Sequence, residues 1–136
     1  NGYTLIRKLF DGNKELGKKL VEPTRIYVKE IMELINQVNV NGIAHITGGG
    51  LDNIGRVNDN FQYVIDNPLP VPSVFDWLQE KGSIETKEMY RTFNMGMGMI
   101  IIVDKAEASK SVSILGKHAQ VVGSVENGKG VNHSAF

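Results

Sequence analysis

Hydrophobic positions recur along the chain with two periods, one typical of helices and one of strands. Apolar residues spaced three or four apart predict short helices over about 3–10, 29–38, 72–82, 86–93 and 105–116. Between them, segments rich in β-branched or alternating apolar residues predict strands over 43–47, 61–65, 97–103 and 119–125. Short helices and strands that alternate in this way are typical of an α/β (α+β) domain, in which a layered mixed sheet carries flanking helices.

The segment Met97–Val103 is the only continuous apolar run in the sequence. A run of this length without a polar member is typical of a strand covered on both faces, so we expect it at the centre of the sheet. Residues 128–136 have no apolar period and are expected to be frayed. The sequence thus predicts a single domain over 1–127 followed by a short tail.

Composition excludes several classes of protein. The 136 residues suffice for one hydrophobic core, and fifteen basic residues balance fifteen acidic ones, so the charge indicates neither nucleic acid nor an anionic membrane as a partner. The absence of cysteine excludes disulfides, thiolate metal sites and a cysteine nucleophile. Three scattered histidines predict no metal centre, and two of them, His118 and His133, are expected at the surface. Without a spanning apolar stretch or a leader-like segment, we expect a cytoplasmic protein.

Three consecutive glycines after the strand expected at 43–47 form the most informative motif. Gly48, Gly49 and Gly50 cost backbone entropy and bury no side chain, so the backbone must bend sharply there or approach a ligand. One interpretation is a tight turn from strand to helix. The other is a cradle whose N–H groups bind a phosphate. His45 is accordingly either a structural residue of the strand or an acid/base group beside that cradle.

A second glycine turn precedes the long apolar run. Gly96 and Gly98 interrupt a strand-like sequence and indicate close approach of the backbone. Arg25 and Arg91 each lie beside a rigid or aromatic neighbour. Each arginine is interpreted either as half of a surface ion pair or as a clamp for a phosphate or carboxylate.

Five segments, taken in order, resemble one known family. They are Asn1–Leu5, Glu22–Val28, Ala44–Leu51, Glu88–Gly96 and Gly98–Met99. Together they resemble the C-terminal domain of the aminoimidazole ribonucleotide synthetases, also called phosphoribosylformylglycinamidine cyclo-ligases. The likeness runs from residue 1 to about 126. The resemblance implies a mixed sheet with flanking helices, partly like a ferredoxin fold, in agreement with the layered interpretation.

The resemblance implies an enzyme of purine biosynthesis. Such an enzyme uses Mg-ATP to phosphorylate the amide oxygen of formylglycinamidine ribonucleotide, and attack by the ring nitrogen then displaces phosphate and closes the imidazole. Family members are two-domain chains that dimerise chiefly through the N-terminal domain, which supplies most contacts to ATP and magnesium. The resemblance therefore implies ATP and magnesium as cofactors and the N-terminal domain of the same chain as a partner. It also implies a homodimer at full length, and weak self-association of this part alone.

The resemblance also implies roles for individual residues. His45 is the expected catalytic residue, as a polar or acid/base contact. The expected substrate- and phosphate-binding residues are Asn1, Gly2, Thr47, Gly48, Gly49, Gly50, Asn94, Gly96 and Gly98. After the glycines the sequence departs from the family pattern, because Leu51–Arg56 is one residue shorter, with Asp52 for Glu and Gly55 for Pro. This departure leaves Asp52 and Asn53 without an assigned role.

Two other functions stay open at this point. Formylglycinamidine ribonucleotide synthetase, selenophosphate synthetase, thiamine-monophosphate kinase and a hydrogenase maturation factor share the two-domain architecture and use ATP to activate an oxygen or transfer a phosphate. The segment Glu88–Gly96 favours the cyclo-ligase, and the lack of cysteine disfavours selenophosphate synthetase. The alternative from another class is a non-catalytic module that binds a phosphorylated metabolite.

Overall fold

A computed structural model describes residues 2–9, 12, 17–18, 20–21 and 23–135. Its α-helices are α1 (Tyr3–Leu9), α3 (Val28–Ile35), α4 (Ser73–Gly82), α5 (Thr86–Thr92) and α6 (Ala108–Leu115). Shorter 3₁₀ helices are η1 (Gly50–Arg56), η2 (Lys105–Glu107) and η3 (Gly116–His118). The strands are β1 (Val40–His45), β2 (Phe61–Ile65), β3 (Met99–Val103), β4 (Gly123–Asn127) and β5 (Gly130–His133). The α/β class predicted from the sequence is confirmed.

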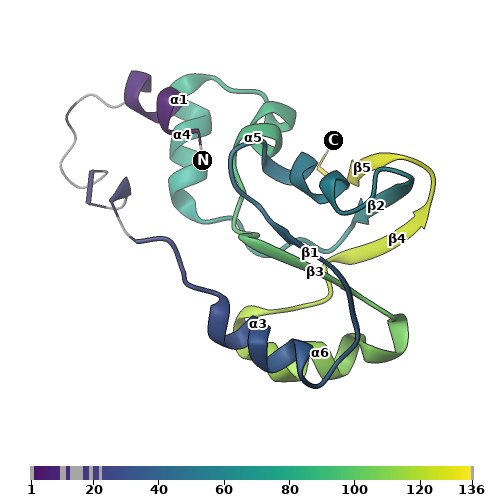
Figure 1. Ribbon diagram of the computed structural model, residues 1–136. Helices are drawn as coiled ribbons and strands as arrows, with labels where there is room; N and C mark the ends of the chain where they lie inside the picture. Colours follow the sequence, from purple (N-terminus) through teal and green to yellow (C-terminus); the bar gives the residue numbers. More distant parts are fainter. Residues whose placement is uncertain (1, 10–11, 13–16, 19, 22, 136) are drawn as a thin grey trace.

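The strands form two small sheets, one of them mixed. β1 and β3 pair antiparallel, and in the other sheet β2 lies between β4, which is antiparallel to it, and β5, which is parallel. Figure 1 shows α3 and α6 side by side next to the β1–β3 pair, while α1, α4 and α5 lie on the other side of it. None of the helices in the described part of the chain has the length and apolarity that a membrane span requires.

The hydrophobic core lies where β1, β2, η1 and α5 meet. Among its almost completely buried members are Ile46, directly after β1, Ile54 of η1 and Met89 of α5. Because side chains alternate along a strand, Ala44 and Ile46 reach this core, while His45 between them is exposed. Burial of its two neighbours therefore holds His45 on the opposite face of β1.

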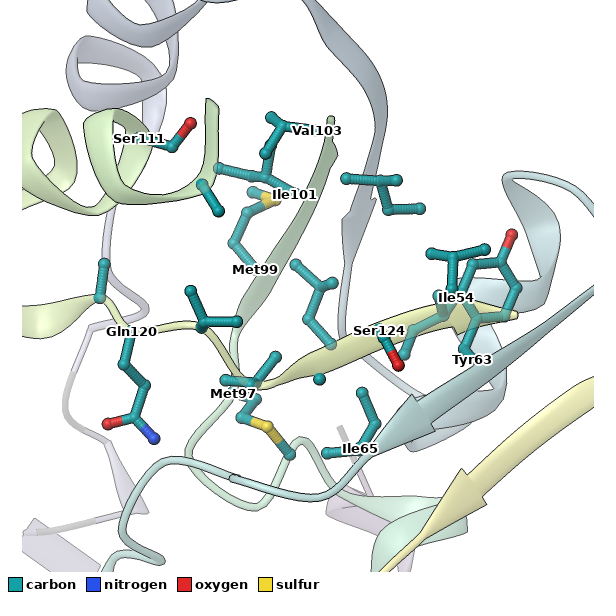
Figure 2. A pocket seen from close by; sticks show the side chains of 18 of the residues that line it. Ile54, Tyr63, Ile65, Met97, Met99, Ile101, Val103, Ser111, Gln120 and Ser124 are labelled. Carbon is teal, nitrogen blue, oxygen red and sulfur yellow. The ribbon is translucent and has the colours of Figure 1, made fainter. Parts of the chain in front are cut away.

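The prediction that residues 97–103 form a central strand covered on both faces is wrong. Among the described residues β3 pairs with β1 alone, and its other edge lies along an apolar hollow of about 870 Å³. Figure 2 shows Met99, Ile101 and Val103 on β3 in this hollow, across from Ile65 of β2. An apolar run does not distinguish a strand that its own domain covers from one that lines an open hollow.

The free edge of β3 carries backbone groups that point away from β1. The N–H of Ile46 donates to the carbonyl oxygen of Gly98 at 2.9 Å. Because hydrogen-bonded pairs alternate along an antiparallel ladder, Ile100 also faces β1, and the N–H of Ile101 points outward. An apolar edge with unpaired N–H groups is a template for pairing with another chain.

We expect concentration-dependent self-association of this chain through the β3 edge. Ile101→Pro removes the outward N–H and leaves the bonds to β1 in place, so this variant should stay monomeric where the parent chain associates. Ile101→Val keeps the N–H and is the matched control. Sedimentation velocity over a wide concentration range measures the effect, and a strictly monomeric parent chain at high concentration would contradict it.

The prediction of a frayed tail over 128–136 is wrong for the residues that the structure describes. β5 lies within this segment and runs parallel to β2, with His133 opposite Ile65. The next residue continues the pairing, because the N–H of Ser134 donates to the carbonyl oxygen of Ile65 at 3.0 Å. The segment carries too few apolar residues to show a period. Its place comes from backbone pairing with a strand more than sixty residues earlier in the chain.

His133 is buried, contrary to the prediction, whereas His118 is exposed as expected. His133 is 1% exposed, and its ring packs on that of Tyr90, with centroids 4.1 Å apart. Its Nδ1 accepts a hydrogen bond from the N–H of Ala135 at 2.9 Å, which requires an unprotonated nitrogen. Burial lowers the pKa of His133, so the fold holds this ring neutral.

We expect mild acid to destabilise the chain through His133. Its folded pKa lies below the unfolded value of about 6.5, so its contribution is complete above that pH and is lost as the pH falls through the folded pKa. In urea melts the free energy of unfolding should fall by up to about 1.4 kcal/mol per pH unit within this window. His133→Gln should remove this slope, and His118→Gln should keep it. An unchanged slope in His133→Gln would contradict the assignment.

Candidate functional site

Two of the predicted motifs meet at the end of β1 and the start of β3. In the antiparallel register His45 lies opposite Met99, and the bond from Ile46 to Gly98 joins the next pair. The glycine loop, Gly48–Gly50, follows directly. Strand pairing therefore brings together segments that lie about fifty residues apart in the sequence.

The exposed side chain of His45 lies beside an aromatic ring from a third segment. The ring centroids of Tyr27 and His45 are 6.0 Å apart at 66°, an edge-on contact. The guanidinium carbon of Arg25 lies 5.4 Å from the Tyr27 centroid, within cation–π distance. A Cβ on Gly98 would overlap the Tyr27 hydroxyl, so the lack of a side chain on Gly98 lets this hydroxyl approach the backbone before β3. Imidazole, phenol and guanidinium groups thus cluster at the start of α3.

Both arginines form ion pairs at the surface. Arg25 Nη2 lies 3.0 Å from Glu30 Oε1, and this hydrogen bond lowers the pKa of Glu30 below its ordinary value. Arg91 Nε lies 3.7 Å from Asp52 Oδ2, and both of these side chains are more than half exposed. Such exposed pairs contribute little to stability. The structure therefore supports the ion-pair interpretation for both arginines, and it places Arg25 in the cluster around His45.

The glycine loop is a tight turn whose conformation depends on glycine. Gly49 and Gly50 have φ angles of 102° and 53°, in the region that other residues rarely adopt. The N–H of Gly50 donates to the carbonyl oxygen of Thr47 at 3.0 Å, and a Cβ on Gly50 would overlap the carbonyl oxygen of Tyr90. Gly50 thus shapes the turn with its own N–H engaged, while Gly48 and Gly49 are exposed.

Asn53 lies in η1, directly after this loop, and its side chain reaches back to the loop carbonyls. The sequence alone assigned it no role. Its side chain is 4% exposed, and its Nδ2 donates to the carbonyl oxygens of Gly50 at 2.7 Å and Gly48 at 3.3 Å. Its Oδ1 is buried and has no hydrogen-bond partner among the residues that the structure describes. The signal in the sequence is a polar amide between two buried residues, Leu51 and Ile54, directly after a glycine turn.

The second glycine turn is closed by its own polar groups. The N–H of Met97 donates to the carbonyl oxygen of Asn94 at 2.9 Å, and the N–H of Gly96 donates to Asn94 Oδ1 at 3.0 Å. Met95 and Gly96 both have positive φ angles. A Cβ on Gly96 would lie 2.8 Å from the carbonyl oxygen of Pro70, so this glycine packs against the proline-rich connector before α4.

The beginning of the described chain packs against Phe93, the residue before the second turn. Gly2 has a φ angle of 61°, and its carbonyl oxygen accepts a hydrogen bond from the N–H of Ile6 at 3.0 Å. A side chain on Gly2 would overlap the ring of Phe93, the residue before Asn94. Gly2, one of the predicted binding residues, is therefore packed against the residue that precedes the second turn. Asn1, another of them, lies outside the described residues.

The candidate site around His45 and the glycine loop does not coincide with the apolar hollow beside β3. The apolar hollow of Figure 2 lies along the free edge of β3, whereas a polar hollow of about 580 Å³ lies beside η1 and α5. Asp52, Lys87 and Arg91 line the polar hollow, next to the glycine loop. Within the described part of the chain, no three His, Asp or Glu side chains gather as they would around a metal ion.

Comparison with known proteins identifies the family. The sequence profile of "AIR synthase related protein, C-terminal domain" matches residues 1–135. A phosphoribosylformylglycinamidine cyclo-ligase of Methanopyrus kandleri is 47% identical over 143 aligned residues, which cover 96% of this chain and 41% of that protein. The protein of the same name from Coxiella burnetii strain RSA 331 is 43% identical, over 93% of this chain and 41% of its own. The chain thus spans about two fifths of these relatives, and it belongs to the AIR synthase related family as the C-terminal domain.

Proposed function

We propose that this chain supplies the C-terminal part of the active site of a phosphoribosylformylglycinamidine cyclo-ligase of purine biosynthesis. In this reaction the amide oxygen of formylglycinamidine ribonucleotide takes the terminal phosphoryl group of ATP and ADP leaves. The amidine nitrogen that becomes the ring nitrogen then attacks the activated carbon and loses a proton, the C–O bond breaks, and phosphate and aminoimidazole ribonucleotide form. The observation that carries the proposal is the pairing of β1 with β3, which brings His45, the glycine loop and Gly98 to one place. The names of the two relatives support it.

In this proposal the exposed residues at the end of β1 bind and orient the substrate. His45 contacts the reacting amidine and takes the proton that the attacking nitrogen loses. The N–H groups of Gly48 and Gly49 bind phosphoryl oxygens, because donors fixed in advance stabilise charge that develops during the reaction. Tyr27 holds the imidazole through its edge-on contact at 6.0 Å.

The proposal assigns the nucleotide and the metal to another part of the active site. ATP supplies the phosphoryl group when it is bound. The described residues provide no cluster of carboxylates suited to magnesium, so we assign this chain no step through the metal. We infer that the N-terminal domain of a longer chain supplies these contacts, that the whole enzyme is a cytoplasmic homodimer, and that this chain alone is inactive.

The test is phosphate release from Mg-ATP with and without formylglycinamidine ribonucleotide. We would compare this chain with a fusion in which it replaces the matching part of the Methanopyrus kandleri relative. Substrate-dependent release by the fusion and none by the chain alone is the expected result. A folded fusion without substrate-dependent release, beside an active natural relative, would contradict the proposal and favour a module that binds a phosphorylated metabolite.

A further inference from the structure

The side chain of Asn53 holds two carbonyl groups of the glycine loop in one direction. Nδ2 donates to the oxygens of Gly50 (2.7 Å) and Gly48 (3.3 Å). Both partners are acceptors, so the amide has one favourable orientation, because the reverse would place Oδ1 against two carbonyl oxygens. The loop carbonyls therefore point inward, toward a buried amide.

This arrangement determines where the next N–H points. A trans peptide is planar, with its C=O and N–H on opposite sides. Because the carbonyl of Gly48 points inward to Asn53, the N–H of Gly49 in the same peptide points outward, and Gly49 is exposed. The N–H of Gly50 differs, because it donates to Thr47. Gly49 therefore offers an oriented donor at the surface of the loop.

The amide of Asn53 lowers the stability of the fold, so its presence here indicates that its Nδ2 donors have a role in the loop. Asn53 lies between the buried residues Leu51 and Ile54, and within the described part of the chain its buried Oδ1 has no hydrogen-bond partner. A buried acceptor without a partner destabilises the fold, and an apolar residue would avoid that cost. An apolar residue would also leave the carbonyls of Gly48 and Gly50 without their donor.

We infer that Asn53 is a positioning residue that fixes the Gly49 N–H as a donor to a phosphoryl oxygen. The inference rests on the proposed function for the identity of the anion and goes beyond it in naming the donor and the residue that orients it. Asn53 itself is too buried to touch the substrate. Asn53 acts by preventing a flip of the peptide between Gly48 and Gly49. Without this restraint, two neighbouring glycines would allow such a flip.

The test is a titration of the ¹⁵N-labelled chain with inorganic phosphate, followed at the Gly49 amide resonance. We expect a saturable shift in the parent chain and an apparent Kd about tenfold weaker in Asn53→Asp, which keeps the shape and loses the donor. Asn53→Ala should weaken binding similarly without adding charge. The matched control is Asn67→Asp, because the Nδ2 of Asn67 donates to the carbonyl oxygen of Val121 (2.8 Å), remote from the glycine loop.

Two results would overturn the inference: no phosphate-dependent shift at Gly49 in the parent chain, or an unchanged Kd in both Asn53 variants. If neither variant folds, amide hydrogen exchange in the parent decides. Rapid exchange at Gly49 beside a protected Gly50 supports the inference, and a protected Gly49 overturns it. Phosphate release by the fusion tests the proposed function separately, so failure of one is distinguishable from failure of the other.

Discussion

His45→Asn in the fusion with the Methanopyrus kandleri relative is expected to lower kcat for substrate-dependent phosphate release by about a hundredfold. Asparagine keeps a polar side chain at the end of β1 but cannot accept and release a proton near neutral pH. Because His45 is exposed while its neighbours Ala44 and Ile46 are buried, the substitution should leave the fold intact. The expected loss is therefore one of chemistry and not of stability.

The matched control for this prediction is His118→Asn. His118 is also exposed but lines the apolar hollow, away from the glycine loop. We expect it to leave kcat and KM unchanged. If His45→Asn raised KM alone and left kcat as it was, His45 would bind substrate equally in ground and transition states, and the acid/base role would be wrong.

Gly50→Ala is expected to destabilise the chain by about 3 kcal/mol, from the combined cost of a positive φ angle and a steric overlap. Gly50 has a φ angle of 53°, and a Cβ there would overlap the carbonyl oxygen of Tyr90 in α5. A backbone atom cannot move aside as a flexible side chain can, so η1 and α5 would have to separate. The free energy of unfolding in urea at neutral pH measures the effect.

Substitutions at two other glycines measure the conformational and the steric contributions to this destabilisation separately. Gly130 has a φ angle of 85° with open space around a Cβ, so Gly130→Ala should cost about 1 kcal/mol from conformation alone. Gly55 has neither feature, so Gly55→Ala should leave stability nearly unchanged or slightly raised. If Gly50→Ala cost no more than Gly130→Ala, the close approach of the loop to α5 would not hold in solution.

The local sequence was sufficient to predict the helices and strands whose apolar residues recur with a helical or strand period. The strand at 61–65 is found with those bounds, and the helices near 3–10, 29–38 and 105–116 appear as α1, α3 and η2 with α6. The glycine run indicated a sharp bend because few other residues adopt its φ angles. In these cases one segment contains the whole signal, since the period of its apolar residues matches one backbone geometry.

The candidate site could be predicted only in part. The identity of His45 and the glycines came from motifs, but Tyr27 and Asn53 entered the site through contacts that no spacing encodes. The engagement of the Gly50 N–H with Thr47 also follows from the closed turn and not from the residue type. A side chain acquires such a role from whichever segment the fold places beside it.

By itself the sequence determined the class of fold, the helices and strands with a clear period, and the family, because these depend on residue order and local geometry. Tertiary structure alone decided that β3 pairs only with β1 among the described residues, that β5 joins β2 and that His133 is buried. It also decided that Asn53 lies under the glycine loop. The physical reason is that strand pairing and burial depend on distant segments, whose backbone groups and surfaces meet only when the chain has folded.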